Sequence, residues 1–217
     1  MALVLVTAAI IWFVVSGTHL PQPGEPITAG TALPAIPRVE VGATADGAPF
    51  IGAAGARVVI EEFGDFQCPF CGAFVRETEP KILSTYVATG KARLIWYAVT
   101  FLGPESIRAA LASLCAQDQG KFWEYRELLY WNQRGENRGG FAPPRLLALA
   151  AQAHLDVPKF RACLASGGHV AALLSSAQAA QRRGVVETPT FFINGQRVAG
   201  ALPYGQFAGL IDAATSR

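Results

Sequence analysis

The alternation of apolar and polar positions first indicates a strand, a helix and a second strand in succession. Residues 56–63 (ARVVIEEF) and 92–99 (ARLIWYAV) are rich in β-branched and aromatic side chains, which favours strands. Between them, Phe74, Ile82 and Tyr86 supply apolar positions along a helix. This order predicts a β-α-β unit, in which the chain leaves the first strand and enters the helix near residue 68.

The second half of the chain contains a long helix-rich stretch, followed by signals for a strand hairpin and a final helix. From Pro104 to about Gln181 it is rich in Ala, Leu and Gln, without strand signals, and it predicts a helical insertion over about residues 104–181. Residues 190–193 and 196–199 then flank Asn194-Gly195, a pair that favours a type I′ hairpin. A helix is expected at 204–214. The predicted fold class is α/β, with the order β-α-β, helical insertion, β-β-α.

The N-terminal residues are unlike the rest. Residues 2–15 (ALVLVTAAIIWFVV) form an apolar run of about 21 Å if helical, which predicts a signal peptide or signal-anchor over residues 1–17. No Lys or Arg occurs before Arg38, so the basic residues that normally precede such a run are expected upstream of residue 1. A Pro-rich linker follows at 18–40. We favour an uncleaved anchor; cleavage and a buried N-terminal helix are the alternatives.

Composition narrows the classes of function. The 217 residues are 51% hydrophobic with a formal net charge of +2, enough for one folded domain, expected at 41–217. Basic residues are scattered, so no nucleic-acid partner is expected. Nothing in the sequence indicates an organic cofactor or a metal.

The chemistry centres on Cys68-Pro69-Phe70-Cys71. A zinc site would need further ligands at compact spacing, whereas Cys115, Cys163 and the three His residues lie far away in the sequence. At a helix N-terminus, free N–H groups and the helix dipole stabilise a thiolate. We therefore expect Cys68 to be the nucleophile and Cys71 the resolving thiol of a redox pair.

Two further features remain ambiguous by themselves. Glu62 shares the strand face of Val58 and Ile60, which indicates either a buried proton acceptor for Cys71 or an exposed position on a partly solvated strand. Thr188-Pro189 precedes a strand: a cis bond there would free the Thr188 backbone to pair with a peptide, but these residues by themselves favour an ordinary trans turn.

Together these residues resemble the DsbA-like family. Glu62-Phe-Gly-Asp-Phe-Gln-Cys68-Pro-Phe-Cys71, Gly120-Lys-Phe-Trp123-Glu-Tyr125, Thr188-Pro-Thr-Phe-Phe-Ile-Asn-Gly195 and Gly200-Ala201 occur in the family's order. The resemblance spans about residues 41–211 and implies a thioredoxin fold with an inserted helical subdomain. It also implies that Cys68 and Cys71 are the redox pair, Glu62 the buried acid, Pro189 the cis-proline and Thr188 the peptide-binding backbone. The chain departs from the strongly oxidising CPHC pattern, because Phe70 replaces a His.

The two remaining cysteines, Cys115 and Cys163, both lie in the helical insertion. An exported protein ordinarily pairs such cysteines, so we expect a structural disulfide; two free buried thiols are the alternative.

The function expected is an extracytoplasmic oxidase that donates the Cys68-Cys71 disulfide to the thiols of exported polypeptides. A DsbB-like or vitamin K epoxide reductase-like membrane protein is the partner that the resemblance implies for reoxidation. A reductase or isomerase of the same fold is one alternative. A membrane-tethered binding or chaperone module with a structural CxxC is another.

Overall fold

The structure is a computed structural model that describes residues 35–216. The predicted signal segment at 1–17 and the linker as far as residue 34 lie outside the described residues. None of the helices within 35–216 has the length and apolar character that a membrane span requires.

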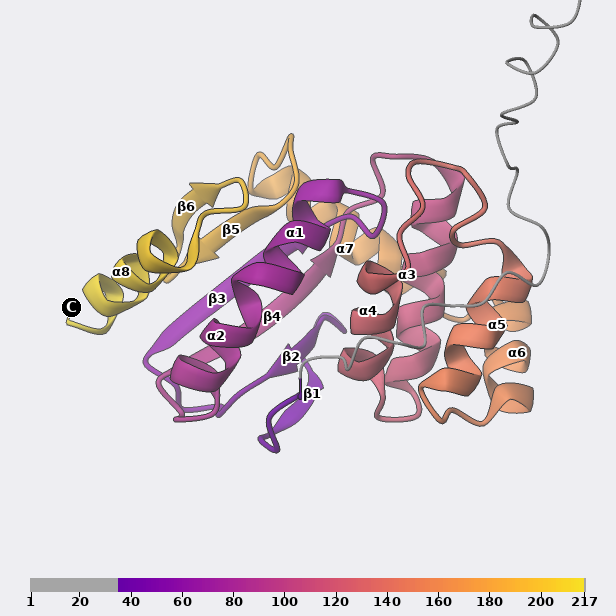
Figure 1. The fold of residues 1–217 in the computed structure, drawn as a ribbon, viewed down its shortest axis with the longest axis horizontal. Helices are drawn as coiled ribbons and strands as arrows, with labels where there is room; N and C mark the ends of the chain where they lie inside the picture. Colours follow the sequence, from indigo (N-terminus) through magenta and orange to yellow (C-terminus); the bar gives the residue numbers. More distant parts are fainter. Residues whose placement is uncertain (1–34, 217) are drawn as a thin grey trace, which may run out of the picture.

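A six-stranded mixed sheet forms the centre of the molecule (Figure 1). Its order is β1-β2-β4-β3-β5-β6, and only β3 and β4 run parallel. The bounds are Val41–Ala43 for β1, Pro49–Ile51 for β2, Val58–Gly64 for β3, Ala92–Ala98 for β4, Thr190–Ile193 for β5 and Gln196–Ala199 for β6. The sequence analysis missed β1 and β2, because three-residue strands show no periodicity; β2 becomes a strand by pairing with β4.

Helices cover both faces of this sheet and one of its ends. In Figure 1, α1 (Pro69–Glu77), α2 (Glu79–Ile82) and α8 (Tyr204–Thr215) lie in front of the sheet, and α7 (Val170–Arg182) lies behind it. Successive side chains of strand β3 point to opposite faces of the sheet. Ile60 belongs to the main core under α1, whereas the Phe63 ring stacks on the Tyr97 ring on the α7 side, with 4.8 Å between the ring centroids.

The helix after β3 is interrupted where the sequence predicted one continuous element. Helix α1 ends at Glu77, α2 begins at Glu79, and a π-helical turn, η1, occupies Leu83–Val87. Pro80 lacks the N–H that would bond one turn back, so the break at Thr78 has a local cause.

The stretch predicted to be a helical insertion contains α3 (Pro104–Gln117), α4 (Phe122–Trp131), α5 (Pro143–Gln152), α6 (Val157–Ser166) and α7. Helices α3 to α6 pack beside the sheet, and α4 contacts α1 (Figure 1). Most aromatic residues of α4 are buried in the main core: Phe122, Trp123, Tyr125 and Tyr130. Cys115 of α3 and Cys163 of α6 form a disulfide with a Cα–Cα distance of 5.8 Å.

The C-terminal elements agree with their sequence predictions. Strands β5 and β6 have the expected bounds, and Asn194 (φ 45°) and Gly195 (φ 83°) both adopt the positive φ that the type I′ turn requires. The predicted α/β class and the order β-α-β, helices, β-β-α are confirmed, with β1 and β2 added in front.

Candidate active site

The first cysteine of the pair lies where β3 has ended and α1 begins. Cys68 is the N-cap of α1, with an extended backbone (φ −68°, ψ 120°), and Pro69 occupies the first turn, where its missing N–H costs nothing. The Cys68 N–H donates to the Asp65 carbonyl over 3.0 Å. The Cys68 sulfur therefore stands at the positive end of the helix dipole.

A segment 120 residues further along the chain completes this site. The Thr188–Pro189 peptide bond is cis. The Cys68 thiol donates to the Thr188 carbonyl, with 3.2 Å between Sγ and O. The structure thus brings Cys68 together with the cis Thr188–Pro189 segment, and the loop before β5 faces the Cys68 sulfur.

The two thiols have opposite electrostatic environments. A hydrogen bond from the Cys71 side chain, aided by the Thr188 side chain and by the Cys71 and Phe70 N–H groups, lowers the Cys68 pKa to about 6 despite burial. Burial raises the pKa of Cys71 well above its usual value, and its side chain has no exposed surface. At neutral pH the reduced pair therefore holds a thiolate on Cys68 and a proton on Cys71.

Both residues between the two cysteines, Pro69 and Phe70, are exposed to solvent. Phe70 is 65% exposed. It carries no charge that could add to the stabilisation of the Cys68 thiolate.

Glu62 is completely buried. Its Oε2 accepts a hydrogen bond from Nη2 of Arg126 over 2.7 Å. Burial raises the pKa of Glu62 to about 8, against the opposing effect of the Arg126 charge. The carboxyl group can therefore exist in either protonation state near neutral pH, which suits a group that exchanges a proton with a neighbour.

Sequence reasoning missed the charged groups around Glu62. Arg126 is fully buried and forms a two-pronged contact with Glu79, at 2.7 and 2.8 Å. Oε1 of Glu127 lies 3.5 Å from Nη1 of Arg126. Glu127 is also buried, and its burial raises its pKa to about 8. The signal was an Arg-Glu pair within the aromatic segment FWEYRELLYW of α4.

Hydrogen bonds from the helical insertion hold the loop that carries Cys68. Nε2 of Gln133 donates to the carbonyls of Phe66 and Cys68, at 2.8 and 2.9 Å. The buried Asp65 carboxylate accepts from the Ser106 hydroxyl at 2.6 Å. These contacts fix the backbone at the start of α1.

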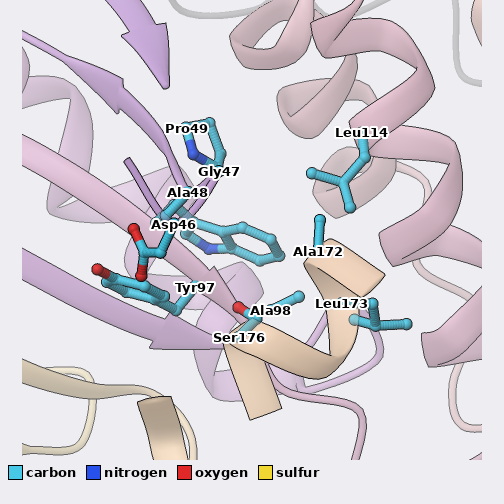
Figure 2. Close-up of a pocket in the computed structure, with 11 residues that line it drawn as sticks. Asp46, Gly47, Ala48, Pro49, Tyr97, Ala98, Leu114, Ala172, Leu173 and Ser176 are labelled. Atoms are coloured by element: carbon cyan, nitrogen blue, oxygen red, sulfur yellow. The ribbon is translucent and has the colours of Figure 1, made fainter. Parts of the chain in front are cut away.

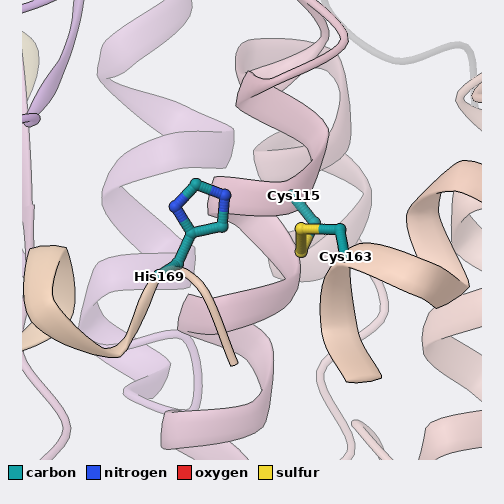
Figure 3. A group of neighbouring side chains, drawn as sticks. All are labelled: Cys115, Cys163 and His169. Atoms are coloured by element: carbon teal, nitrogen blue, oxygen red, sulfur yellow. A yellow bond between two sulfur atoms is a disulfide. The ribbon is translucent and has the colours of Figure 1, made fainter. Parts of the chain in front are cut away.

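A pocket and a group of Cys and His side chains lie outside this site. A pocket lined by β2, β4, α3 and α7 includes neither Cys68 nor Cys71 (Figure 2). Figure 3 shows His169 beside the Cys115–Cys163 disulfide, where its Nε2 pairs with Asp118 at 2.8 Å. Because the two sulfurs are bonded to each other, neither offers a thiolate to a metal ion in this state.

Comparison with known proteins gives consistent results. Residues 44–213 match the family described as thioredoxin. Disulfide bond formation protein D of Bacillus subtilis is 27% identical over 169 residues, which are 76% of either chain. The crystal structure of oxidised BdbD from the same organism has a TM-score of 0.74 and 25% identity, and the match covers 82% of this chain and 98% of that one.

A second group of relatives is much longer. Na(+)/H(+) antiporter NhaA 1 of Salinispora arenicola is 34% identical over 148 residues, 67% of this chain. This chain spans only about a fifth of that antiporter's length, since the match covers 21% of it.

Proposed function

The chain belongs to the thioredoxin family, among its DsbA-like protein disulfide oxidoreductases, and from this premise we propose that it is an oxidase. It donates the Cys68-Cys71 disulfide to thiols of exported polypeptides. The observation that carries this proposal is the Cys68 sulfur at the start of α1, with its pKa lowered to about 6. Stabilising the thiolate stabilises the reduced pair, which makes the disulfide form a better electron acceptor.

The reaction consists of two exchanges. A substrate thiolate attacks the Cys68 sulfur, the Cys68-Cys71 bond breaks, and Cys71 leaves with the electron pair. The protonated Glu62 carboxyl supplies the proton that the buried Cys71 sulfur then needs. A second substrate thiolate attacks the substrate sulfur of the mixed disulfide and releases Cys68 as a thiolate, so two electrons pass from substrate to enzyme.

Substrate binding follows from the surroundings of Cys68. The Thr188 backbone lies beside the sulfur, and an extended peptide pairs with it by main-chain hydrogen bonds. Exposed Phe70 and Val186, at 65% and 78%, provide apolar contacts for an unfolded chain.

The location that we propose is the extracytoplasmic side of the cell membrane. A disulfide such as Cys115–Cys163 persists in oxidising compartments, and the apolar run of residues 2–15 suits an anchor. A DsbB-like or vitamin K epoxide reductase-like membrane protein then reoxidises the Cys68-Cys71 pair.

One observation favours a second function, that of a reductase or isomerase. Phe70 replaces a His and contributes no charge to hold the Cys68 thiolate, so a less oxidising pair is the competing outcome.

The deciding experiment is the reduction potential of the full chain, obtained by equilibration with glutathione buffers and counting of free thiols. A potential near about −120 mV supports the oxidase, and one near about −270 mV supports the reductase. A Cys71→Ser variant that captures no substrate as a mixed disulfide would instead favour a binding or chaperone module with a structural CxxC.

A further inference from the structure

The only guanidinium that contacts Glu62 in the described part of the chain comes from the helical insertion. Arg126 of α4 contacts Glu62 of β3 and Glu79 of α2. The side chain is completely buried, so water does not screen its charge. The insertion therefore contributes directly to the electrostatics of the redox centre.

Arg126, Glu62, Glu79 and Glu127 form a buried charge cluster with more acidic groups than basic ones. One guanidinium faces three buried carboxyl groups, and a cluster with all three ionised would carry two uncompensated negative charges. The titratable groups around Glu62 are Cys71 on α1, Glu79 on α2, and Arg126, Glu127 and Tyr130 on α4. The cluster must therefore hold protons at neutral pH.

The hydrogen bonds show which carboxyl group is less firmly held. Arg126 donates two short bonds to Glu79 but one to Glu62. Oε1 of Glu62 makes no hydrogen bond of good geometry within the described residues, and neither does the Tyr130 hydroxyl. Both atoms face Gly64: a Cβ added there would lie 3.3 Å from Oε1 and 2.9 Å from the Tyr130 oxygen. Oε1 of Glu62 is thus not bonded to Arg126. It lies on the same side of Gly64 as Nε1 of the Trp96 indole, which also favours the ionised carboxylate, and it is the oxygen available to bind or release a proton.

We propose that Arg126 is a positioning residue: shared between Glu79 and Glu62, it orients the Glu62 carboxyl and sets how readily this group exchanges a proton with Cys71. This inference rests on the proposed redox function of the Cys68-Cys71 pair. Arg126 acts through Glu62 and does not touch the reacting sulfurs.

Neutralising Arg126 and neutralising Glu79 should shift the pKa of Glu62 in opposite directions. Removing the Arg126 charge takes away the group that favours ionised Glu62, so Glu62 holds its proton to higher pH. Neutralising Glu79 removes a competing negative charge and leaves the guanidinium to Glu62, so Glu62 loses its proton at lower pH.

The assay is the reaction of the reduced full chain with Ellman's reagent, in which the Cys115–Cys163 disulfide stays oxidised, as checked by a count of two free thiols. The Cys68 thiolate attacks the reagent, forms a mixed disulfide and releases the first thionitrobenzoate. Cys71 then gives its proton to ionised Glu62, attacks the Cys68 sulfur and expels the second thionitrobenzoate. The second phase depends on Glu62, and the first phase is an internal control.

Four variants make the test specific. Relative to the wild type, whose second-phase midpoint is expected near pH 8, Arg126→Gln should raise that midpoint and Glu79→Gln should lower it, each by about one pH unit or more. Arg126→Lys keeps a cation but not the two-pronged contact, so a smaller rise is expected; it carries the test if Arg126→Gln does not fold. Glu124→Gln, on the same helix but with a half-exposed side chain that pairs with Lys121, should leave the midpoint unchanged.

The outcomes separate the inference from the proposed function. Opposite shifts in Arg126 and Glu79 variants, with an unchanged Glu124→Gln, support the inference. A two-phase reaction whose second midpoint is the same in every folded variant, or moves in one direction in all of them, overturns it and leaves the redox function intact. Release of a single equivalent by the wild type overturns the proposed function itself, because Cys71 would then not resolve the mixed disulfide.

Discussion

Replacing Cys71 by alanine removes the largest of the interactions that hold the Cys68 sulfur in its thiolate form. That interaction is the hydrogen bond from the Cys71 thiol, and a hydrogen bond to a charged group contributes about 1.5–3 kcal/mol, or about one to two pKa units. We expect the Cys68 pKa to rise from about 6 to about 7–8 in Cys71→Ala. At pH 7 the thiolate fraction would fall from about 0.9 to about 0.1–0.5.

Cys71→Ser is the matched control, because its hydroxyl keeps a donor at the same position. The pKa of Cys68 in this variant should stay within about half a unit of the value in the reduced wild type.

The measurement is the rate of alkylation of Cys68 by iodoacetamide as a function of pH. The midpoint of the profile should be compared, not the rate at one pH, because a thiolate of higher pKa is also more nucleophilic. Equal midpoints for Cys71→Ala and Cys71→Ser would refute the assigned hydrogen bond and leave the helix N-terminus and Thr188 as the sources of the low pKa.

Three further predictions concern stability. Since the pKa of Cys68 in the folded protein lies below its usual 9.0, the thiolate stabilises the reduced protein fully above about pH 9 and loses this effect as the pH falls to about 6. In urea unfolding, the free energy of unfolding of the reduced form should therefore fall relative to that of the oxidised form as the pH is lowered over this range. The same pH dependence of the free energy of unfolding in both forms would contradict this prediction. Removing the Cys115–Cys163 disulfide with two Ala substitutions frees a loop with a sequence separation of 48 and should lower the free energy of unfolding by about 4 kcal/mol on the chain-entropy model. A loss below about 1 kcal/mol in a urea titration would show that the loop constraint is unimportant. Gly64→Ala would place a methyl group 2.9 Å from the Tyr130 oxygen and should lower the free energy of unfolding by about 1–3 kcal/mol, measured by thermal and urea unfolding. An unchanged stability would mean that the side chains around Gly64 can move aside without cost.

Local sequence signals predicted most of the elements around the site. Strand β3 and the start of α1 followed from a β-rich run, a Gly-Asp break and Pro69, all of which act over a few residues. The β5–β6 hairpin followed from Asn194-Gly195. The strands β1 and β2 escaped prediction because their conformation depends on pairing with the rest of the sheet.

The buried charge cluster could not be predicted by the same means. The aromatic residues around Arg126 and Glu127 indicate that α4 packs against other elements, but nothing near them in the sequence shows that it packs on α1 or that the charged pair itself is buried. Glu79 lies 47 residues from Arg126, so their contact depends on the packing of two separate units.

The sequence by itself determined the thioredoxin-type order of elements and the presence of a CxxC pair at a helix N-terminus, because both depend on short-range patterns of residue type. Only the tertiary structure decided that Cys68 faces the Thr188 carbonyl and that Glu62 shares a guanidinium with Glu79. Those contacts join residues far apart in the chain, and their strength comes from burial, which removes the water that would otherwise screen each charge.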